Sequence, residues 1–327
     1  MKAVVCDRPG NEEVLRLADV AAPEIGPEDV RIRVFATSVN RADILQRQGL
    51  YPPPPGASSI LGLECAGEII ELGERVSGWR LGDRVMALLA GGGYAEEVAV
   101  HYGSVLPVPS GLSWEEAGAF PEVFLTAFLN LFLLGQVPDR GRALVHGGGS
   151  GVGTAATTLL KLRGVQVFVT AGGEEKCRRC RQHGADVAID YRSQDFAEVI
   201  HEATDGRGVH VVLDHIGAKY LDGNLRSLAH DGRLVVIGLM GGAKAEINLA
   251  PLLTRRLSVI GSTLRTRSVQ DKARIVAAFR EQFGADLEAG RIRPVIDSVF
   301  PLERVADAHR RVQSSEHFGK VVLRVRA

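Results

Sequence analysis

The chain has 327 residues, of which 45% are hydrophobic and 24% charged, and its 39 basic side chains balance its 39 acidic ones. This length suits two domains with full hydrophobic cores. A formal net charge of zero gives no support for binding nucleic acid or an anionic membrane surface. The four cysteines are few for a disulfide framework, no apolar run approaches the ~20 residues of a membrane span, and charge follows Met1 too soon for a signal peptide. We therefore expect a cytoplasmic protein.

The first part of the chain, to about residue 120, is predicted to consist of short strands and turns. Clusters of proline and glycine, such as those at 52–55 and 91–93, separate its apolar, β-branched segments. Short strands at this spacing are typical of a barrel or a sandwich. The candidate strands are residues 2–5, 30–36, 66–72, 84–88 and 95–100.

After a helical pattern at 114–134, the chain alternates between apolar segments and helical patterns. The candidate strands are 143–145, 166–170, 187–190, 209–214, 233–238 and 257–261, and the helices between them are 154–163, 174–183, 194–203 and 219–228. Six buried strands with crossover helices predict a doubly wound α/β sheet. A long helix near 270–283 leads to a tail that is again strand-like, so we expect the tail to return to the first part.

A glycine-dense loop at 146–153 connects the first strand of this sheet to its first helix. Glycines admit a diphosphate close to the backbone, and the N–H groups of a helix N-terminus face it. The strict dinucleotide fingerprint does not fit, because Ser150 stands between Gly148 and Gly153 where the middle glycine should be. The loop therefore predicts a dinucleotide site. Ser150 is not expected to act as a nucleophile, since no histidine–acid relay accompanies it.

The end of the second strand indicates which dinucleotide binds. Domains that prefer NAD usually carry an acidic residue there to bind the ribose hydroxyls, whereas residues 169–173 contain none. Lys176 and Tyr191 follow nearby and could hold a 2′-phosphate, so we predict NADPH. The alternatives are that Lys176 is an ordinary solvated helix residue and that Glu174 or Glu175 repels the phosphate.

Several motifs occur in an order that resembles the zinc-free quinone oxidoreductases of the medium-chain dehydrogenase/reductase superfamily. The region 40–67, together with 238–242, is most similar to the p53-inducible quinone oxidoreductase subgroup. The motifs are Asn40 to Asp43, Gln46 to Pro52, Gly62-x-Glu64-x-x-Gly67, Gly82 to Val85, Gly92 to Ala95, Thr126-Ala127, Ser150 to Gly153, Thr170 to Gly172 with Lys176, Asp214-x-x-Gly217 and Gly319-Lys320.

The resemblance implies an α/β protein with a GroES-like β-barrel catalytic domain, residues 1–123 and 267–327, and a doubly wound Rossmann domain, residues 124–266, that binds NADPH in the cleft between them. It also implies a homodimer, often paired through the last Rossmann strand. Zinc-dependent relatives have cysteine where Asn40 stands and histidine where Leu63 stands, so we expect no metal, although Glu64 is retained. Cys177 and Cys180 form an isolated C-x-x-C and are interpreted as surface or packing cysteines.

The resemblance also implies roles for particular residues. Tyr51 is the candidate donor to the acceptor's carbonyl oxygen, with packing against the adjacent prolines as the alternative. Asn40 would orient the nicotinamide ribose or the acceptor, unless it only caps the following turn. Asp43 is expected to stabilise its loop. The remaining cofactor contacts are expected at Thr126, Ser150, Gly151, Val152, Gly172, Lys176, Tyr191, Leu239, Leu264 and Arg265, and Gly173 replaces the family's usual serine.

These expectations favour direct transfer of hydride from NADPH to a quinone. A conjugated enone or enoyl compound is an alternative acceptor, because it needs the same cofactor and carbonyl anchor. A third possibility is an NADPH-binding protein without catalytic function, comparable to the crystallins and RNA-binding proteins of this family.

Overall fold

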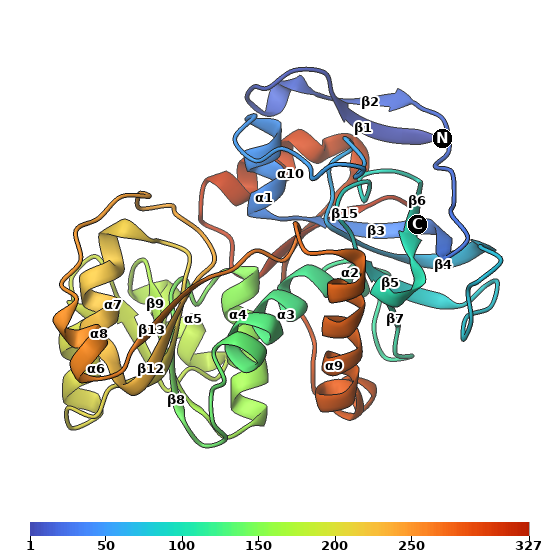
Figure 1. Cartoon of the computed structure of the whole chain (residues 1–327). Helices are drawn as coiled ribbons and strands as arrows, with labels where there is room; N and C mark the ends of the chain where they lie inside the picture. The colour runs from blue at the N-terminus through green and yellow to red at the C-terminus, as the bar shows by residue number, and fades with distance from the viewer. Residues whose placement is uncertain (327) are drawn as a thin grey trace. The chain divides into compact units, whose positions relative to one another are not determined.

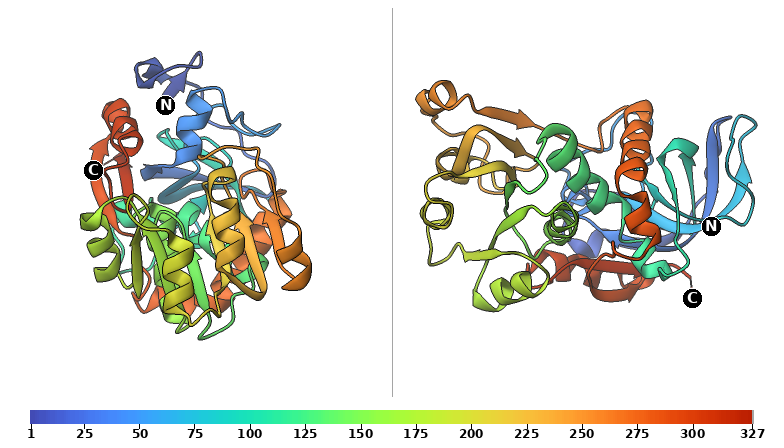
Figure 2. Two further views of the ribbon diagram at one scale, coloured as in Figure 1. Left: turned by 90° about the vertical axis from the view of Figure 1, so that its left-hand side faces the viewer. Right: turned by 90° about the horizontal axis from the view of Figure 1, so that it is seen from below.

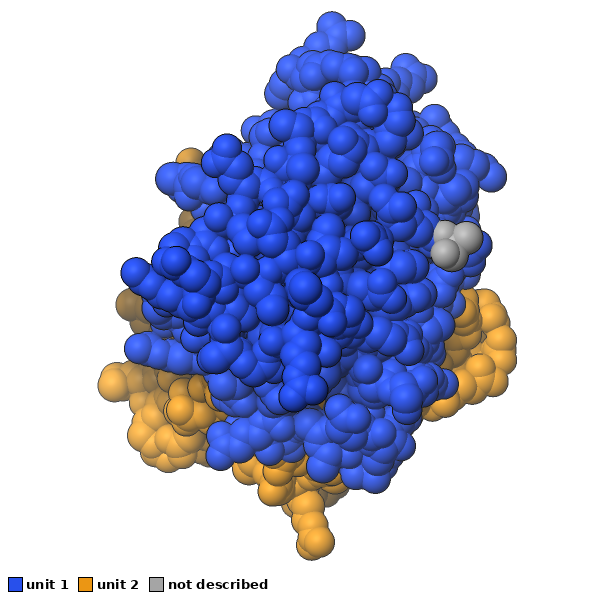
Figure 3. All heavy atoms as spheres, turned by 90° about the vertical axis from the view of Figure 1, so that its right-hand side faces the viewer, with its two compact units in different colours: residues 1–125, 264–327 blue, residues 126–263 orange. Residues whose placement is uncertain are grey.

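The computed structural model describes residues 1–326, which form two compact units (Figures 1 and 3). Unit 1 contains residues 1–125 and 264–327, and unit 2 contains residues 126–263. None of the helices in the described residues is long and apolar enough to cross a membrane.

Unit 1 is built around β3 (Asp29–Val39), a strand of 11 residues that pairs with three others. Antiparallel pairing with β15 joins the end of the chain to its beginning: Val321 lies opposite Val39. The sheet order is β14-β15-β3-β4-β5-β7, with β6 also paired to β3, while β1 and β2 form a separate antiparallel pair. The bounds are β1 (Lys2–Cys6), β2 (Leu15–Asp19), β4 (Glu64–Leu72), β5 (Arg84–Leu88), β6 (Glu97–His101), β7 (Val105–Pro107), β14 (Ile296–Pro301) and β15 (Lys320–Arg324).

Unit 1 contains two apolar clusters of buried residues. Alternate residues of β3, including Val30, Ile32 and Val34, are fully buried, as expected for a strand with one face toward the core. A second cluster, around Ile44 and Tyr94, packs beneath the last helix of the unit. The helices are α1 (Arg41–Arg47), α2 (Trp114–Ala117), α3 (Pro121–Phe128), α9 (Val269–Glu288) and α10 (Val305–Gln313), with short 3₁₀ turns η1 (Glu12–Val14), η2 (Tyr102–Ser104) and η5 (Leu302–Arg304).

Unit 2 is a six-stranded parallel sheet with the order β10-β9-β8-β11-β12-β13 (Figure 2). Counted from its first strand, this is the order 3-2-1-4-5-6 of dinucleotide-binding Rossmann folds. The predicted doubly wound sheet is therefore confirmed. Its strands are β8 (Arg142–Val145), β9 (Gln166–Ala171), β10 (Val187–Asp190), β11 (Val209–Asp214), β12 (Leu228–Val236) and β13 (Ser258–Gly261), and its helices are η3 (Leu129–Leu134), α4 (Gly151–Leu162), α5 (Glu174–Gln182), α6 (Phe196–Ala203), η4 (Ala218–Tyr220), α7 (Leu221–Ser227) and α8 (Ala250–Thr254).

Two predicted elements differ from those observed. The helical pattern at 114–134 is divided into α2, α3 and a π-helical turn η3, because Gly118 and Pro121 interrupt it. Gly118 packs closely on the sheet, since a Cβ there would lie 2.7 Å from the carbonyl carbon of Ala36. The strand predicted at 233–238 begins earlier and ends at Val236, and it includes a left-handed residue, Asp231, with φ of 59°.

Candidate active site

The glycine loop of unit 2 has the shape of a diphosphate-binding turn. It lies between β8 and α4, and a Cβ on Gly153 would lie 2.3 Å from the carbonyl oxygen of Gly147, so only glycine fits there. Ser150 is the N-cap of α4: its Oγ accepts a hydrogen bond from the N–H of Gly153 at 3.0 Å. Ser150, which stands where the fingerprint has its middle glycine, therefore caps the N-terminus of α4. The remaining N–H groups of the first turn are suited to an anion.

A buried polar network supports this loop. The ring of His146 joins Thr170 Oγ1 (3.0 Å) to Asn224 Oδ1 (2.7 Å). Asn224 Nδ2 in turn donates to Asp214 Oδ2, at 3.1 Å. Because the amide oxygen of Asn224 can only accept, Nε2 of His146 carries the proton, and the Thr170 hydroxyl donates to Nδ1. Burial lowers the pKa of His146 to about 3, which keeps the ring neutral.

The network closes on the loop itself. Thr170 Oγ1 accepts the N–H of Gly147 at 3.3 Å, and the carbonyl oxygen of Thr170 accepts the N–H of Gly148 at 2.9 Å. His146 and Asn224 were not singled out from the sequence. The one signal was the position of His146 as the first residue of the glycine loop; Asn224 belongs to no motif.

The end of β9 brings together two of the predicted cofactor contacts. A Cβ on Gly172 would lie 2.7 Å from the hydroxyl oxygen of Tyr191, and 3.3 Å from Nε of Arg192. Asp190, the last residue of β10, is directed to this turn: its Oδ1 accepts the N–H groups of Gly173 (2.9 Å) and Arg192 (3.0 Å). Its carboxylate is thus used to shape the turn. Arg192 is exposed and adds a cation that was missed in the sequence.

Unit 1 contains a buried ion pair between Glu64 and Lys320. Their side chains are 0% and 3% exposed, and Nζ of Lys320 lies 2.9 Å from Oε1 of Glu64. Asn40 completes the group, because its Nδ2 donates to Glu64 (2.9 Å) and its Oδ1 accepts from Lys320 (2.6 Å). Ser38 Oγ and the backbone N–H of Glu122 also donate to Glu64, at 2.5 and 2.9 Å. The carboxylate therefore accepts four hydrogen bonds, which a buried charge requires.

Asp43 stabilises the turn that carries Asn40. Its carboxylate accepts the backbone N–H groups of Asn40 (2.8 Å) and Gly62 (2.9 Å), which ties two loops together. Burial raises the pKa of Asp43 to about 6, although both hydrogen bonds oppose the shift. The side chain of Asn40 is directed to the ion pair, where its amide bonds both partners. It therefore does more than cap the following turn, which was the alternative.

The loop of Tyr51 is held by Arg265. The guanidinium carbon lies 5.4 Å from the centre of the Tyr51 ring, and Nε donates to the carbonyl oxygen of Ala90 at 2.9 Å. Nη2 donates to Gln46 Oε1 at 2.5 Å. Burial raises the pKa of the Tyr51 phenol, so the hydroxyl stays protonated at neutral pH and can donate a hydrogen bond. Arg265, predicted to bind cofactor, thus has a structural function within unit 1.

Glu122 lies in the first turn of α3, beside the ion pair. Among residues 1–326, no partner hydrogen-bonds to its Oε2 atom, which is buried. Burial and the neighbouring Glu64 carboxylate raise the pKa of Glu122 to about 8. An unpaired buried carboxyl oxygen with a raised pKa marks a candidate functional residue. Only the packing of residues distant in sequence reveals it.

The residues at the zinc-ligand positions do not fit a zinc ion. Asn40 and Glu64 are bonded to each other and to the ammonium of Lys320, whose positive charge would repel a divalent cation, and Leu63 offers no ligand. In the part of the chain that the structure describes, no three His, Cys, Asp or Glu side chains are grouped to hold a metal. Cys177 and Cys180 are free thiols and are buried, so of the two expected alternatives the packing one is observed.

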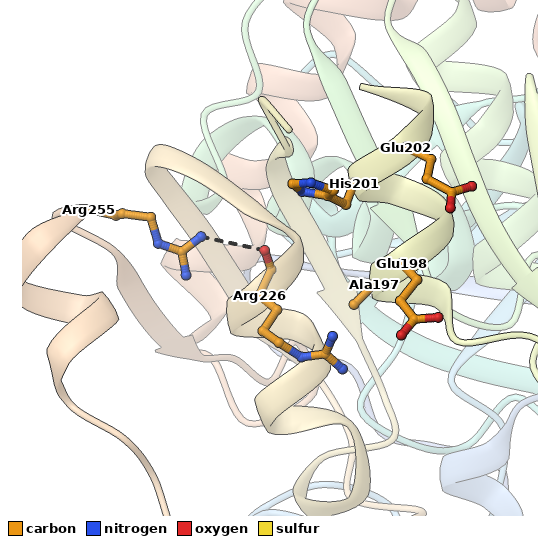
Figure 4. A pocket seen from close by; sticks show the side chains of 6 residues that line it. All are labelled: Ala197, Glu198, His201, Glu202, Arg226 and Arg255. Carbon is orange, nitrogen blue, oxygen red and sulfur yellow. Dashed lines mark hydrogen bonds between the residues drawn. The ribbon is translucent and has the colours of Figure 1, made fainter. Parts of the chain in front are cut away.

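A surface hollow of about 450 Å³ lies on unit 2, between α6, α7 and the residue after α8 (Figure 4). None of the predicted site residues lines it.

The predicted site residues are divided between the two units. Unit 1 carries Asn40, Tyr51, Leu264 and Arg265; unit 2 carries Thr126, Ser150, Gly151, Val152, Gly172, Lys176, Tyr191 and Leu239. Thr126 and Leu264 are buried, Leu239 is exposed, and Lys176 lies in the first turn of α5. Their contacts with a cofactor stay predictions.

Known proteins are similar in sequence to this chain along nearly its whole length. The family described as "Alcohol dehydrogenase GroES-like domain" matches residues 26–110, and "Zinc-binding dehydrogenase" matches residues 151–279. Quinone oxidoreductase of Lama guanicoe is 34% identical over 326 residues, covering 99% of this chain and 97% of that protein. A phenolphthiocerol/phthiocerol polyketide synthase of Mycobacterium tuberculosis is 32% identical over 321 residues, but these make up 98% of this chain and only 14% of the much longer synthase polypeptide.

Solved structures of oxidoreductases have the same fold as this chain. A quinone oxidoreductase of Pseudomonas syringae pv. Tomato DC3000 has a TM-score of 0.87 at 28% identity, covering 99% of both chains. A mycobacterial protein in complex with NADPH has a TM-score of 0.86 at 28% identity, covering 99% of this chain and 100% of the other. The CurK enoyl reductase has a TM-score of 0.85 at 28% identity, covering 99% and 98%. This chain belongs to the quinone oxidoreductase family of the medium-chain dehydrogenase/reductase superfamily of nicotinamide-dependent oxidoreductases.

Proposed function

We propose that this protein uses NADPH to reduce quinones without a metal ion. The observation that carries the proposal is the closed group of Asn40, Glu64 and Lys320, which occupies the metal-ligand positions. Without a Lewis acid to polarise the carbonyl, an acceptor that is itself a strong electrophile is favoured, and quinones meet that condition. The quinone oxidoreductase relatives support this acceptor class. The motifs at 40–67 and 238–242 favour the p53-inducible subgroup.

NADPH, when bound, supplies a hydride from C4 of its nicotinamide. The glycine loop and the N-terminus of α4 would hold the diphosphate, with Ser150, Gly151 and Val152 as the nearest residues. Tyr51 would donate a hydrogen bond to the acceptor's oxygen, where negative charge develops. Asn40, held rigid by Glu64 and Lys320, would orient the nicotinamide ribose or the acceptor.

Selection of NADPH over NADH is assigned to the end of β9. Lys176, Tyr191 and Arg192 would surround a 2′-phosphate, while Asp190 is engaged by two backbone N–H groups. Charge-assisted hydrogen bonds are worth about 1.5–3 kcal/mol each. Arg192→Ala should therefore weaken NADPH binding by at least about tenfold and leave NADH binding unchanged, as measured by fluorescence titration. Arg207→Ala, an exposed cation of the same unit, is the matched control; equal affinity of the wild type for NADH and NADPH would refute the assignment.

The acceptor class is tested by initial rates with a naphthoquinone, a phenanthrenequinone, a 2-alkenal and an enoyl thioester. Enoyl reduction is the second candidate, because the CurK enoyl reductase has the same fold. We expect the quinones to be the fastest substrates. A negligible rate with quinones together with rapid enoyl reduction would instead identify the protein as an enoyl reductase. Binding of NADPH without turnover of any acceptor would indicate a protein without catalytic function.

We also propose a homodimer formed through β13. This strand pairs only with β12 in the sheet order and so leaves one edge open, and its Val259 side chain is 45% exposed. An open apolar edge is suited to pairing with a second copy. Light scattering should give the mass of a dimer for the wild type and of a monomer for Val259→Lys. A wild-type monomer at micromolar concentration would contradict the proposal.

A further inference from the structure

We propose that Glu122 is the acid that delivers the proton accompanying hydride transfer, an inference that rests on the proposed reduction of a conjugated carbonyl acceptor. Glu122 is placed by α3, whose first turn points its own backbone N–H at Oε2 of Glu64, 2.9 Å away. Its carboxyl Oε2 is buried, and no residue among 1–326 hydrogen-bonds to it. A carboxyl group in this position has a buried oxygen that is not used to stabilise the fold.

The surroundings of Glu122 contain both signs of charge. The charged and titratable groups that act on it come from six segments of unit 1: Glu64 on β4, Lys320 on β15, Asp43 on α1, Lys272 on α9, and the neighbouring Tyr51 and Arg265. Lys320 is already bonded to Glu64, and Nζ of Lys272 donates to the carbonyl oxygen of Arg265 at 2.7 Å. Neither ammonium therefore forms an ion pair with Glu122.

Two neighbouring carboxyl groups are thus placed in opposite environments. Glu64 accepts four hydrogen bonds, one of them from an ammonium, whereas Oε2 of Glu122 accepts none from residues 1–326. Burial and the neighbouring Glu64 carboxylate raise the pKa of Glu122 to about 8, so Glu122 is mostly protonated at neutral pH. A buried carboxyl group whose pKa is raised toward the working pH is typical of acid–base catalysis.

Tyr51 cannot easily take the same function. Burial raises the pKa of its phenol above the ordinary value of 10, so it donates a hydrogen bond but holds its proton. A proton donor is most effective when its pKa lies near the working pH, which Glu122 satisfies and Tyr51 does not. We therefore assign polarisation of the carbonyl to Tyr51 and proton delivery to Glu122.

The step balances without a further reagent. The acceptor gains a hydride with its electron pair and becomes an anion, while NADPH is oxidised to NADP⁺. The O–H bond of Glu122 then breaks, and its proton forms a new bond to that anion. Water returns a proton to the Glu122 carboxylate, so the net change is acceptor plus NADPH plus one proton to reduced acceptor plus NADP⁺.

The first test needs no turnover. Infrared spectra of the protein without cofactor should show the carbonyl stretch of a protonated carboxyl group at neutral pH, which disappears as the pH is raised through about 8 and is absent from Glu122→Gln. Glu303→Gln, an exposed glutamate of the same unit, is the matched control and should keep the band. A band that still disappears near pH 8 in Glu122→Gln would overturn the proposal.

The second test measures catalysis. Wild-type kcat should fall as the pH rises above about 8, whereas Glu122→Gln should be slower by about 10²-fold at neutral pH and lack this fall, with NADPH affinity within twofold of wild type. Glu122→Asp retains an acid and should recover part of the rate together with the pH dependence. Wild-type turnover with an unchanged rate and profile in Glu122→Gln would refute this inference and leave the proposed function standing. No wild-type turnover with any acceptor would refute both.

Discussion

The two units contain buried polar networks of different electrical character. In unit 2 the network of Thr170, His146 and Asn224 is neutral, and the one carboxylate that it reaches, Asp214, also accepts the backbone N–H groups of Ile216 and Gly217. In unit 1 the network is organised around a buried ion pair, Glu64 with Lys320. Neutral hydrogen bonds hold a backbone shape, whereas a buried charge also changes the protonation of its neighbours. The difference matches a binding function for unit 2 and a chemical function for unit 1.

Breaking the ion pair of unit 1 should have the largest effect on stability. Lys320→Met leaves the Glu64 carboxylate buried without its cation, which should lower the free energy of unfolding by about 3–5 kcal/mol. Urea unfolding at neutral pH measures the loss. The double variant Lys320→Met with Glu64→Gln removes both charges and should lose clearly less than the sum of the two single variants. A loss below about 1 kcal/mol in Lys320→Met would mean that the network is not electrostatically coupled.

A side chain added to the glycine loop of unit 2 should have the second largest effect on stability. A Cβ in Gly153→Ala would lie 2.3 Å from the carbonyl oxygen of Gly147, so the loop must shift; we expect a loss of about 1–3 kcal/mol and NADPH affinity reduced by at least about tenfold. Ser150→Ala removes only the cap and should cost about 1 kcal/mol. Gly284→Ala, on α9 of unit 1, where a Cβ meets no atom within 4 Å, is the control. Normal NADPH binding by Gly153→Ala would contradict the assigned role of the loop.

Substitution of His146 in the neutral network of unit 2 should have the smallest effect on stability, and this effect should depend on pH. The folded-state pKa of His146 is about 3, against 6.5 for the ordinary side chain. Its stabilising contribution is therefore present above pH 6.5 and is lost as the pH falls below that value, because the unfolded chain binds the proton first. The stability difference between the wild type and His146→Gln should shrink by up to about 1.4 kcal/mol per pH unit below pH 6. His230→Gln, an exposed histidine of the same unit, should show no such trend; a flat difference for His146→Gln would show that its ring is not buried as the neutral form.

Regular parts of the fold were predictable because their residues repeat a simple pattern. The bounds of β10 and β11 match those predicted, since both are short runs of mostly apolar residues in a parallel sheet. The start of β12 was missed because the polar residues His230 and Asp231 lie within it. Helix α10 was missed as well, because arginines and other polar residues separate its few buried apolar residues and weaken the helical pattern.

The candidate site was predictable only where a motif is local. The sequence locates the glycine loop between a strand and a helix, as observed, and Ser150 is the cap of that helix. The cofactor contacts of the loop and of Tyr191 stay predictions. Lys320 and Glu64 are 256 residues apart, and no spacing rule connects them. Glu122 carries no motif of its own, and its raised pKa arises from packing between segments distant in sequence.

Reduction of quinones by NADPH without a metal ion is tested by the rate of NADPH oxidation with a naphthoquinone as acceptor, measured before and after exhaustive treatment with a chelator. We expect turnover that the chelator leaves unchanged. Loss of activity on chelation that zinc restores, or no oxidation of NADPH by any quinone, would contradict it.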